Sequence, residues 1–225
     1  MLPKHFCYSA WLLLAVGISC NSSTKQTQTA TFIAAGKIRN PAEEYTLEKG
    51  TWYFPAKTFV EYRDSTKADS LTLNWYSGDL RILKEPVLYT EASRGEVFRF
   101  TCLRSFDAPF AIRVEKSVAG PAKLVLKIAD GTHGDEPRKL VVNTTKELTS
   151  AQWEQVEIAA KASEFWQMPA RIMDFGCDGS EWIMEGRSQN NYHVVNRWSP
   201  KAASNYRALC LKLVELSGVK FKNVN

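Results

Sequence analysis

The sequence predicts an α+β domain, built as an antiparallel sheet of five to seven strands with two main helices packed on one face. Residues 96–143 contain consecutive segments in which apolar and polar side chains alternate, separated by short turns. Two amphipathic segments with helix-capping starts lie later in the chain, and strands and helices do not alternate regularly. With 225 residues, of which 44% are hydrophobic and 24% charged, the chain can form one ordinary globular core.

The first predicted element is a broken helix over residues 68–85. Leu71, Trp75 and Ile82 recur at helix-like offsets, and Pro86 would end the helix. The aromatic residues in and before this segment are interpreted as core packing rather than as a sugar-stacking surface. They are Trp52, Tyr53, Phe54, Trp75 and Tyr76.

Four strands are predicted next in the chain. They are expected over residues 97–104, 110–116, 124–128 and 139–143. One face of the first strand is apolar and consists of Phe98, Phe100 and Cys102. Arg99 and Thr101 lie on its other face, and Arg113 and Glu115 of the second strand are expected to be exposed. This alternation predicts a sheet with one buried face and one polar face.

The clearest helix start in the chain follows these strands. Thr149 and the glutamine three residues later, Gln152, form the pattern of a capping box. Trp153, Val156 and Ala160 then recur on one side of the predicted helix. This stripe is expected to pack on the apolar face of the sheet.

Two further strands, over residues 180–186 and 192–198, are predicted to complete the sheet before a second main helix. Ser199 is expected to cap that helix, with Pro200 in its first turn and Gly218 at its end. Its buried stripe is expected to be Tyr206, Leu209, Cys210, Leu213 and Leu216.

The first 19 residues (1–19) are typical of an export signal. A basic start at Lys4 precedes an apolar run over residues 6–18, which is shorter than the roughly 20 residues of a membrane-spanning helix. The run ends in the sequence GISC, which resembles the lipobox of bacterial lipoproteins, with Gly17 where those signals usually carry leucine. The resemblance implies that Cys20 becomes acylated and that the preceding signal is removed.

Residues 20–45 are predicted to form a flexible tether, and residues 46–225 a single folded domain. The stretch after Cys20 is rich in Ser, Thr and Gln and has no apolar face. Acyl chains such as palmitate would hold the protein to a membrane of the cell envelope, with the outer membrane or the cell surface favoured. The alternative is a secreted protein in which Cys20 has no special role.

Charge and cysteine content restrict the partners. The formal net charge of +5 is mild, and no cluster of five or more Lys and Arg occurs, so nucleic acid is not an expected partner. Beyond Cys20, the odd set of Cys102, Cys177 and Cys210 does not form a disulfide framework. Cys102 and Cys210 are expected to be small buried hydrophobes, and the spacing selects no disulfide pair.

The last two predicted strands carry the main candidate site. If their loop has an odd number of residues, Glu181, Glu185, His193 and Arg197 share one sheet face, opposite an apolar face. Burial favours this odd loop, because an even loop would mix charged and apolar side chains. The four groups could bind a metal or act as acid and base, although the two glutamates lie about 13 Å apart along the strand. The alternative is a solvated face with ordinary cross-strand ion pairs.

A second candidate is the acidic, glycine-containing turn over residues 130–136. Asp130, His133 and Asp135 could ligate a divalent metal ion, but their spacing fits no calcium-binding loop. Such turns also occur without metal. The sequence contains no nucleophile elbow, no H-E-x-x-H motif and no phosphate-binding glycine loop, and it indicates no cofactor.

Two stretches resemble a family of bacterial exported and lipid-anchored proteins that has no assigned activity. They are FRFTCLRSFDAPFAIRVE at positions 98–115 and DGSEWIMEGRSQNNYHVVNRWSP at positions 178–200. The resemblance spans most of residues 95–218. It implies a single domain in an exported protein, and it assigns no catalytic residue.

Together these patterns predict a lipid-anchored protein of the bacterial envelope or periplasm. Its folded domain is expected to be a non-catalytic binding or structural module, with the membrane and an envelope protein or ligand as partners. The alternative is an envelope hydrolase or metal-dependent enzyme that uses the face formed by Glu181, Glu185 and His193.

Overall fold

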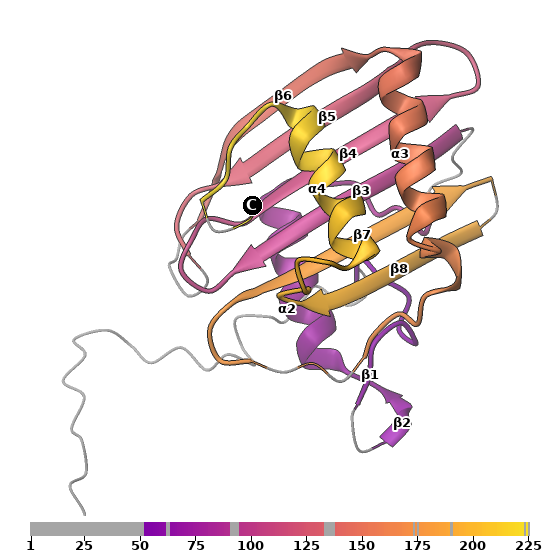
Figure 1. Cartoon of the computed structure of the whole chain (residues 1–225). Coiled ribbons are helices and arrows are strands. Elements are labelled where there is room, and N and C mark those ends of the chain that lie inside the picture. Colours follow the sequence, from indigo (N-terminus) through magenta and orange to yellow (C-terminus); the bar gives the residue numbers. More distant parts are fainter. Residues whose placement is uncertain are drawn as a thin grey trace, which may run out of the picture. The chain divides into compact units, whose positions relative to one another are not determined.

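The computed structural model describes residues 52–61, 64–90, 95–132, 138–172, 174, 176–189, 191–222 and 224, all within one compact unit of residues 39–225. Its centre is a six-stranded antiparallel sheet. The strands are β3 (Gly95–Arg104), β4 (Phe110–Ser117), β5 (Ala122–Ala129), β6 (Leu140–Leu148), β7 (Ser180–Ser188) and β8 (Asn191–Trp198). Their order across the sheet is β6-β5-β4-β3-β7-β8 (Figure 1). The predicted α+β class and strand number are confirmed.

Helices cover both faces of this sheet. They are α2 (Ser70–Ile82), α3 (Ser150–Ala162) and α4 (Asn205–Ser217), and a two-stranded sheet of β1 (Val60–Glu61) and β2 (Asp64–Ala68) precedes them. The helices α3 and α4 lie together on one face, as predicted, and α2 lies on the opposite face (Figure 1). The sequence predicts a helix near α2 but does not predict that this helix covers the opposite face. With α2 there, the sheet is buried from two sides. The predicted signal, Cys20 and the tether lie outside the described residues.

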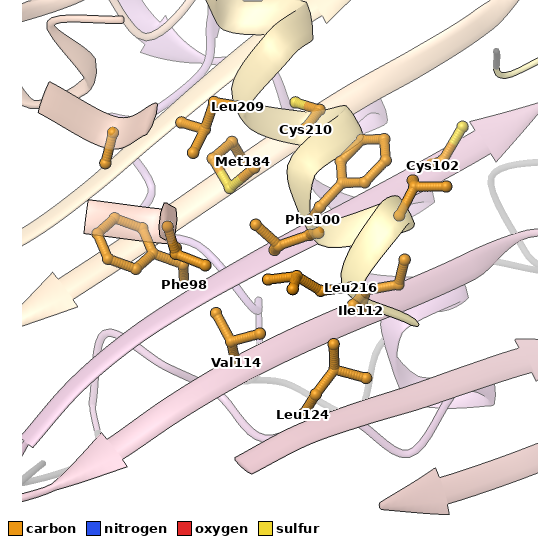
Figure 2. Close-up of a cluster of buried hydrophobic side chains, with 14 of the residues drawn as sticks. Phe98, Phe100, Cys102, Ile112, Val114, Leu124, Met184, Leu209, Cys210 and Leu216 are labelled. Carbon is orange, nitrogen blue, oxygen red and sulfur yellow. The ribbon is translucent and has the colours of Figure 1, made fainter. Parts of the chain in front are cut away.

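The face under α3 and α4 carries the larger apolar core. The alternating positions of β3 and β4 lie on the side of the sheet that α3 and α4 cover, and Figure 2 labels Phe98, Phe100, Ile112 and Val114 among them. The predicted stripe of α3 is confirmed: its buried residues are Trp153, Val156 and Ala160. The predicted stripe of the last helix is also confirmed: Tyr206, Leu209, Cys210, Leu213 and Leu216 are all buried in the same core.

The two helices on this face begin at hydrogen-bonded caps. The capping box of Thr149 and Gln152 forms as predicted. The cap of α4 is Ser204, which accepts a hydrogen bond from the backbone N–H of Arg207, and not Ser199. Ser199 Oγ instead accepts from the backbone N–H of Ser180 at 3.1 Å, so this serine continues the β7–β8 pairing. The predicted helix start is therefore wrong by five residues.

The helix α2 is one continuous helix rather than the predicted broken one. Asp69 caps it by accepting from the backbone N–H of Thr72 at 3.0 Å. Its buried side includes Leu73, Tyr76 and Leu80, whereas the predicted stripe residue Leu71 is 72% exposed. The buried aromatics before and in this helix, Tyr53, Phe54 and Tyr76, join this second core as expected. The spacing of apolar residues does not mark the buried side of α2, because polar residues complete that side of the helix.

The sheet face under α2 buries charged side chains. Arg99 is fully buried, and its Nη1 donates to the carbonyl of Pro86 at 2.7 Å. Glu85 lies 3.0 Å from both Arg113 and Lys127, so its carboxylate has two cationic partners besides Arg99. These cations lower the pKa of Glu85 below its ordinary value, although burial alone would raise it. The expectation that Arg113 of β4 is exposed is wrong, because its side chain is 12% exposed and pairs with Glu85. Such pairing compensates the burial of charge on this face.

The two edges of the sheet differ. Along β8, the chain at residues 168–170 covers the strand, and the backbone N–H of Asn196 donates to Ala170 O at 2.7 Å. Along β6, no further strand pairs among the described residues, and most β6 side chains are exposed. None of the described helices combines the length and the apolarity that crossing a membrane would require.

Candidate functional site

Ser188 pairs with Asn191 across the β7–β8 hairpin, so two residues separate the strands and not the predicted odd number. Glu185 pairs with Val194, and Trp182 pairs with Arg197. This register places Glu181 and Glu185 on the face under α2, and His193 and Arg197 on the face under α3 and α4. The prediction that all four share one face is wrong. The prediction assumed that only apolar side chains would be buried, whereas this hairpin buries charged side chains on the face under α2.

Glu185 is sealed inside the protein and cannot reach a ligand. Its Oε2 lies 2.7 Å from Nε and 2.5 Å from Nη2 of Arg99, and its Oε1 accepts from the Tyr192 hydroxyl at 2.9 Å. Burial raises the pKa of Glu185 despite this pairing. The hydrogen bonds use both carboxylate oxygens, so Glu185 has a structural role.

His193 and Arg197 bind the backbone of a neighbouring segment, at residues 168 and 169. Nε2 of His193 lies 2.9 Å from the carbonyl oxygen of Met168, and its ring packs at 5.1 Å on Phe165. Burial lowers the pKa of His193. Arg197 donates from Nη2 to Pro169 O at 3.0 Å. These contacts hold the chain that covers the edge of β8.

Glu181, a member of this predicted set, lies in the wall of a cavity. A cleft of about 310 Å³ lies at the end of β3, β7 and β8, beside α2 and the segment that follows residue 170. Its walls include Trp75, Arg171, Asp174, Glu181, Asn196 and Trp198. We call this cavity the Glu181 cleft. Its volume is at the lower end of the range for small-molecule sites, about 300–1,000 Å³.

The carboxyl group of Glu181 is buried beside a neutral partner. It is 8% exposed, and its Oε2 accepts from Asn196 Nδ2 at 2.7 Å. Burial raises the pKa of Glu181, and the opposing effects of Asn196, Tyr76 and Arg171 are smaller. Among the described residues, no cation lies within ion-pair distance of this carboxylate. The group can therefore exchange hydrogen bonds or a proton with a ligand in the cleft.

Two glycines fix the position of Trp198 in the cleft wall. A Cβ atom on Gly176 would lie 2.0 Å from Nε1 of Trp198, and one on Gly179 would lie 2.8 Å from Cζ2. Only glycine lets the chain approach the indole this closely. The backbone N–H of Trp198 donates to Asp174 Oδ2 at 2.9 Å, which joins the same segment to β8.

The arginines of the cleft already have partners. Arg171 Nη1 lies 2.9 Å from Asp69 Oδ2, and so ties the cleft to the start of α2. Arg104 donates from Nε to Ala108 O at 3.1 Å and from Nη1 to Lys222 O at 3.1 Å. Both arginines that line the cleft among the described residues are therefore engaged by other groups of the protein.

The predicted metal site is only partly described. Asp130 Oδ1 accepts from the backbone N–H of Lys139 at 2.6 Å, which closes the turn between β5 and β6. His133 and Asp135 lie outside the described residues. In the part of the chain that the structure describes, no group of three or more His, Cys, Asp or Glu side chains is arranged to hold a metal ion.

The cysteines behave as two classes. Cys102 and Cys210 are buried and free, as expected, and burial raises the pKa of Cys102 to about 12. Cys177 is exposed and free at the Glu181 cleft.

Sequence reasoning missed most of the cleft. The sequence pattern places Trp75 in the core and gives no reason to group Asn196, Asp174 and Trp198 with Glu181. The two glycines of the D-G-containing segment before β7 were the available signal, because close backbone approach is a common reason for glycine near a site. The chain matches no protein-family model, and no curated protein matches it significantly.

Proposed function

We propose that this chain is a lipid-anchored protein of the bacterial envelope whose α+β domain binds a small polar ligand in the Glu181 cleft. The observation that carries the binding role is the carboxyl group of Glu181. The other deeply buried carboxylates of the sheet face under α2, Glu85 and Glu185, each lie against an arginine. Glu181 has neutral partners instead, the amide of Asn196 and the hydroxyl of Tyr76, and no cation among the described residues lies at ion-pair distance from it.

The energetics favour a functional reason for this arrangement. Burying a carboxyl group without an ion pair costs free energy, and in a cleft that cost is offset when a ligand supplies the missing partner. A carboxyl with a raised pKa on the wall of a small cavity is therefore typical of a site.

The arrangement favours binding over the alternative enzyme. Glu185 is enclosed by Arg99 and Tyr192, and His193 lies on the other side of the sheet from Glu181. An acid–base pair must reach one substrate from both groups at hydrogen-bond distance. The set of Glu181, Glu185 and His193 does not meet that requirement.

The anchoring part of the proposal is supported by the apolar signal-like run and by Cys20 after it. An acylated Cys20 would keep the domain close to a membrane surface through the polar stretch over residues 21–31.

The binding role is tested by titrating the domain with three probes of different charge while recording the indole N–H signals of Trp75 and Trp198. The probes are a panel of neutral methyl glycosides, tetramethylammonium chloride and inorganic phosphate. Trp166, which packs on the other face of the sheet against Phe98, is the internal reference.

A binding site in the cleft predicts a saturable shift of the Trp75 or Trp198 signal with at least one probe, and no shift of Trp166. The shift should disappear in Glu181→Leu and persist in Glu147→Gln, which alters an exposed glutamate of β6. If no probe shifts these signals at millimolar concentration, the proposed binding role is wrong.

A further inference from the structure

The charged side chains that line the Glu181 cleft include Arg104, Arg171 and Asp174, and each already has a partner within the protein. Arg171 pairs with Asp69 at 2.9 Å. Arg104 lies 3.6 Å from Asp107 and donates to backbone carbonyls, and Asp174 accepts from a backbone N–H. An ion in the cleft would compete with these pairs, whereas a neutral ligand would leave them intact.

The polar groups inside the cleft suit hydroxyl groups. The Glu181 carboxyl and the Asn196 amide are joined by a 2.7 Å hydrogen bond, so they offer acceptors and donors side by side. A hydroxyl both donates and accepts one such bond. Two neighbouring hydroxyls on one ring would therefore pair with the carboxyl and the amide together. The burial of Glu181 favours the same partner, because a neutral hydroxyl does not require a fully charged carboxylate.

The walls of the cleft supply apolar area. Trp75 projects from α2 and Trp198 ends β8, and both are partly exposed where they line the cavity. A large indole combines an apolar face with a polar N–H. The C–H groups of a sugar ring could pack on such a face while its hydroxyls point to the polar base. Gly176 and Gly179 keep the Trp198 indole in place for this contact.

We propose that the ligand of the Glu181 cleft is a neutral saccharide ring, packed on Trp198 with its hydroxyls paired to Glu181 and Asn196. This inference rests on the proposed binding function and names its ligand class. The cavity of about 310 Å³ fits a small ligand of this kind rather than a long chain.

The test compares two substitutions of Glu181 in the titration with methyl glycosides. Glu181→Gln keeps a donor and an acceptor at the carboxyl position, whereas Glu181→Leu removes both. For a saccharide, the leucine variant should weaken binding by about tenfold or more, and the glutamine variant by much less. Trp198→Ala should weaken binding by a similar factor, because it removes the packing surface.

Control variants separate binding from folding. Trp198→Phe keeps an aromatic face and should retain most of the affinity, and Trp166→Phe should retain all of it. Circular dichroism and the reference signals of each variant show that the sheet has formed. A variant that does not fold is replaced in the comparison by its conservative partner, Glu181→Gln or Trp198→Phe.

The outcomes also separate the two proposals. If tetramethylammonium or phosphate binds in the cleft and no glycoside does, the saccharide inference is wrong while the binding function stands. If glycosides bind but Glu181→Leu and Trp198→Ala leave the affinity unchanged, the saccharide does not occupy this cleft, and the inference is again wrong. If none of the three probes binds, both proposals fail.

Discussion

Arg99 and Glu185 lie directly opposite each other on β3 and β7, and both side chains are completely buried. The guanidinium also reaches Glu85 at 3.4 Å. The centre of the sheet is therefore held by an ion cluster on one side and by apolar packing on the other. Arg99 and Glu185 lie 86 positions apart in the chain, and so they link the β3–β4 hairpin to the β7–β8 hairpin.

Removing one partner of this pair should be strongly destabilising. Arg99→Ala leaves Glu185 buried without its cation, and we expect the free energy of unfolding to fall by about 3–5 kcal/mol. Urea denaturation monitored by tryptophan fluorescence measures this loss. The double variant Arg99→Met with Glu185→Leu should lose less than the single variant, because no uncompensated carboxylate remains there. Equal losses in the two variants would contradict this role of the pair.

Glu181→Gln should stabilise the ligand-free protein at neutral pH. The pKa of Glu181 is raised in the folded state above its ordinary value of 4.5, so the folded protein holds a proton that the unfolded chain releases. The contribution of Glu181 to stability therefore falls as pH rises through this window and stays low above the folded pKa. Urea midpoints from about pH 4 to pH 7 should show a gap between variant and wild type that widens with pH. The exposed Glu147→Gln should show no such gap, and a gap that narrows with pH would contradict the assignment.

Gly176→Ala should disturb the cleft while leaving both sheet cores intact. Its Cβ would lie 2.0 Å from the Trp198 indole nitrogen, so the indole or the segment before β7 must move. We expect a shifted Trp198 indole signal and loss of the ligand-induced changes in the cleft, with a stability loss of about 1–3 kcal/mol. Nuclear magnetic resonance of the indole region and urea denaturation check these outcomes. An unchanged Trp198 signal would show that the wall is not fixed by this glycine.

Cys20→Ser should abolish membrane attachment. Cells that produce the whole chain are grown with an alkynyl palmitate, and we expect the wild type to carry the label and to fractionate with membranes. The variant should lose both properties, because the thiol is the proposed acylation site. Cys177→Ser is the matched control and should keep the label. Label that persists in Cys20→Ser would rule out this anchor.

The apolar core could be predicted from the sequence because its rules are local. Alternation in β3 and β4 and the capping box at Thr149 involve residues within a few positions of one another. The buried stripe of α3 could be predicted from helical spacing alone. In such patterns, the spacing of apolar residues along the sequence indicates which side of the element is buried.

The second face could not be predicted by the same rules. Whether Arg99 or Glu185 is buried depends on a partner from a distant part of the chain, and a single sequence does not reveal that partner. The expectation that charged side chains face solvent predicts an odd hairpin loop. That loop places His193 on the wrong face of the sheet. The cleft could not be predicted for the same reason, because Trp75 and Trp198 line one cavity only after α2 packs on the sheet.

No strand among the described residues pairs with the outer edge of β6, and this edge limits how copies of the domain could add to one another through their strands. Two copies that paired along β6 would use up that edge in both, since the other end of each sheet is covered by the chain at residues 168–170. Growth by strand addition then stops at a twofold pair and cannot continue into a filament. This one-sided arrangement guards against fibre formation.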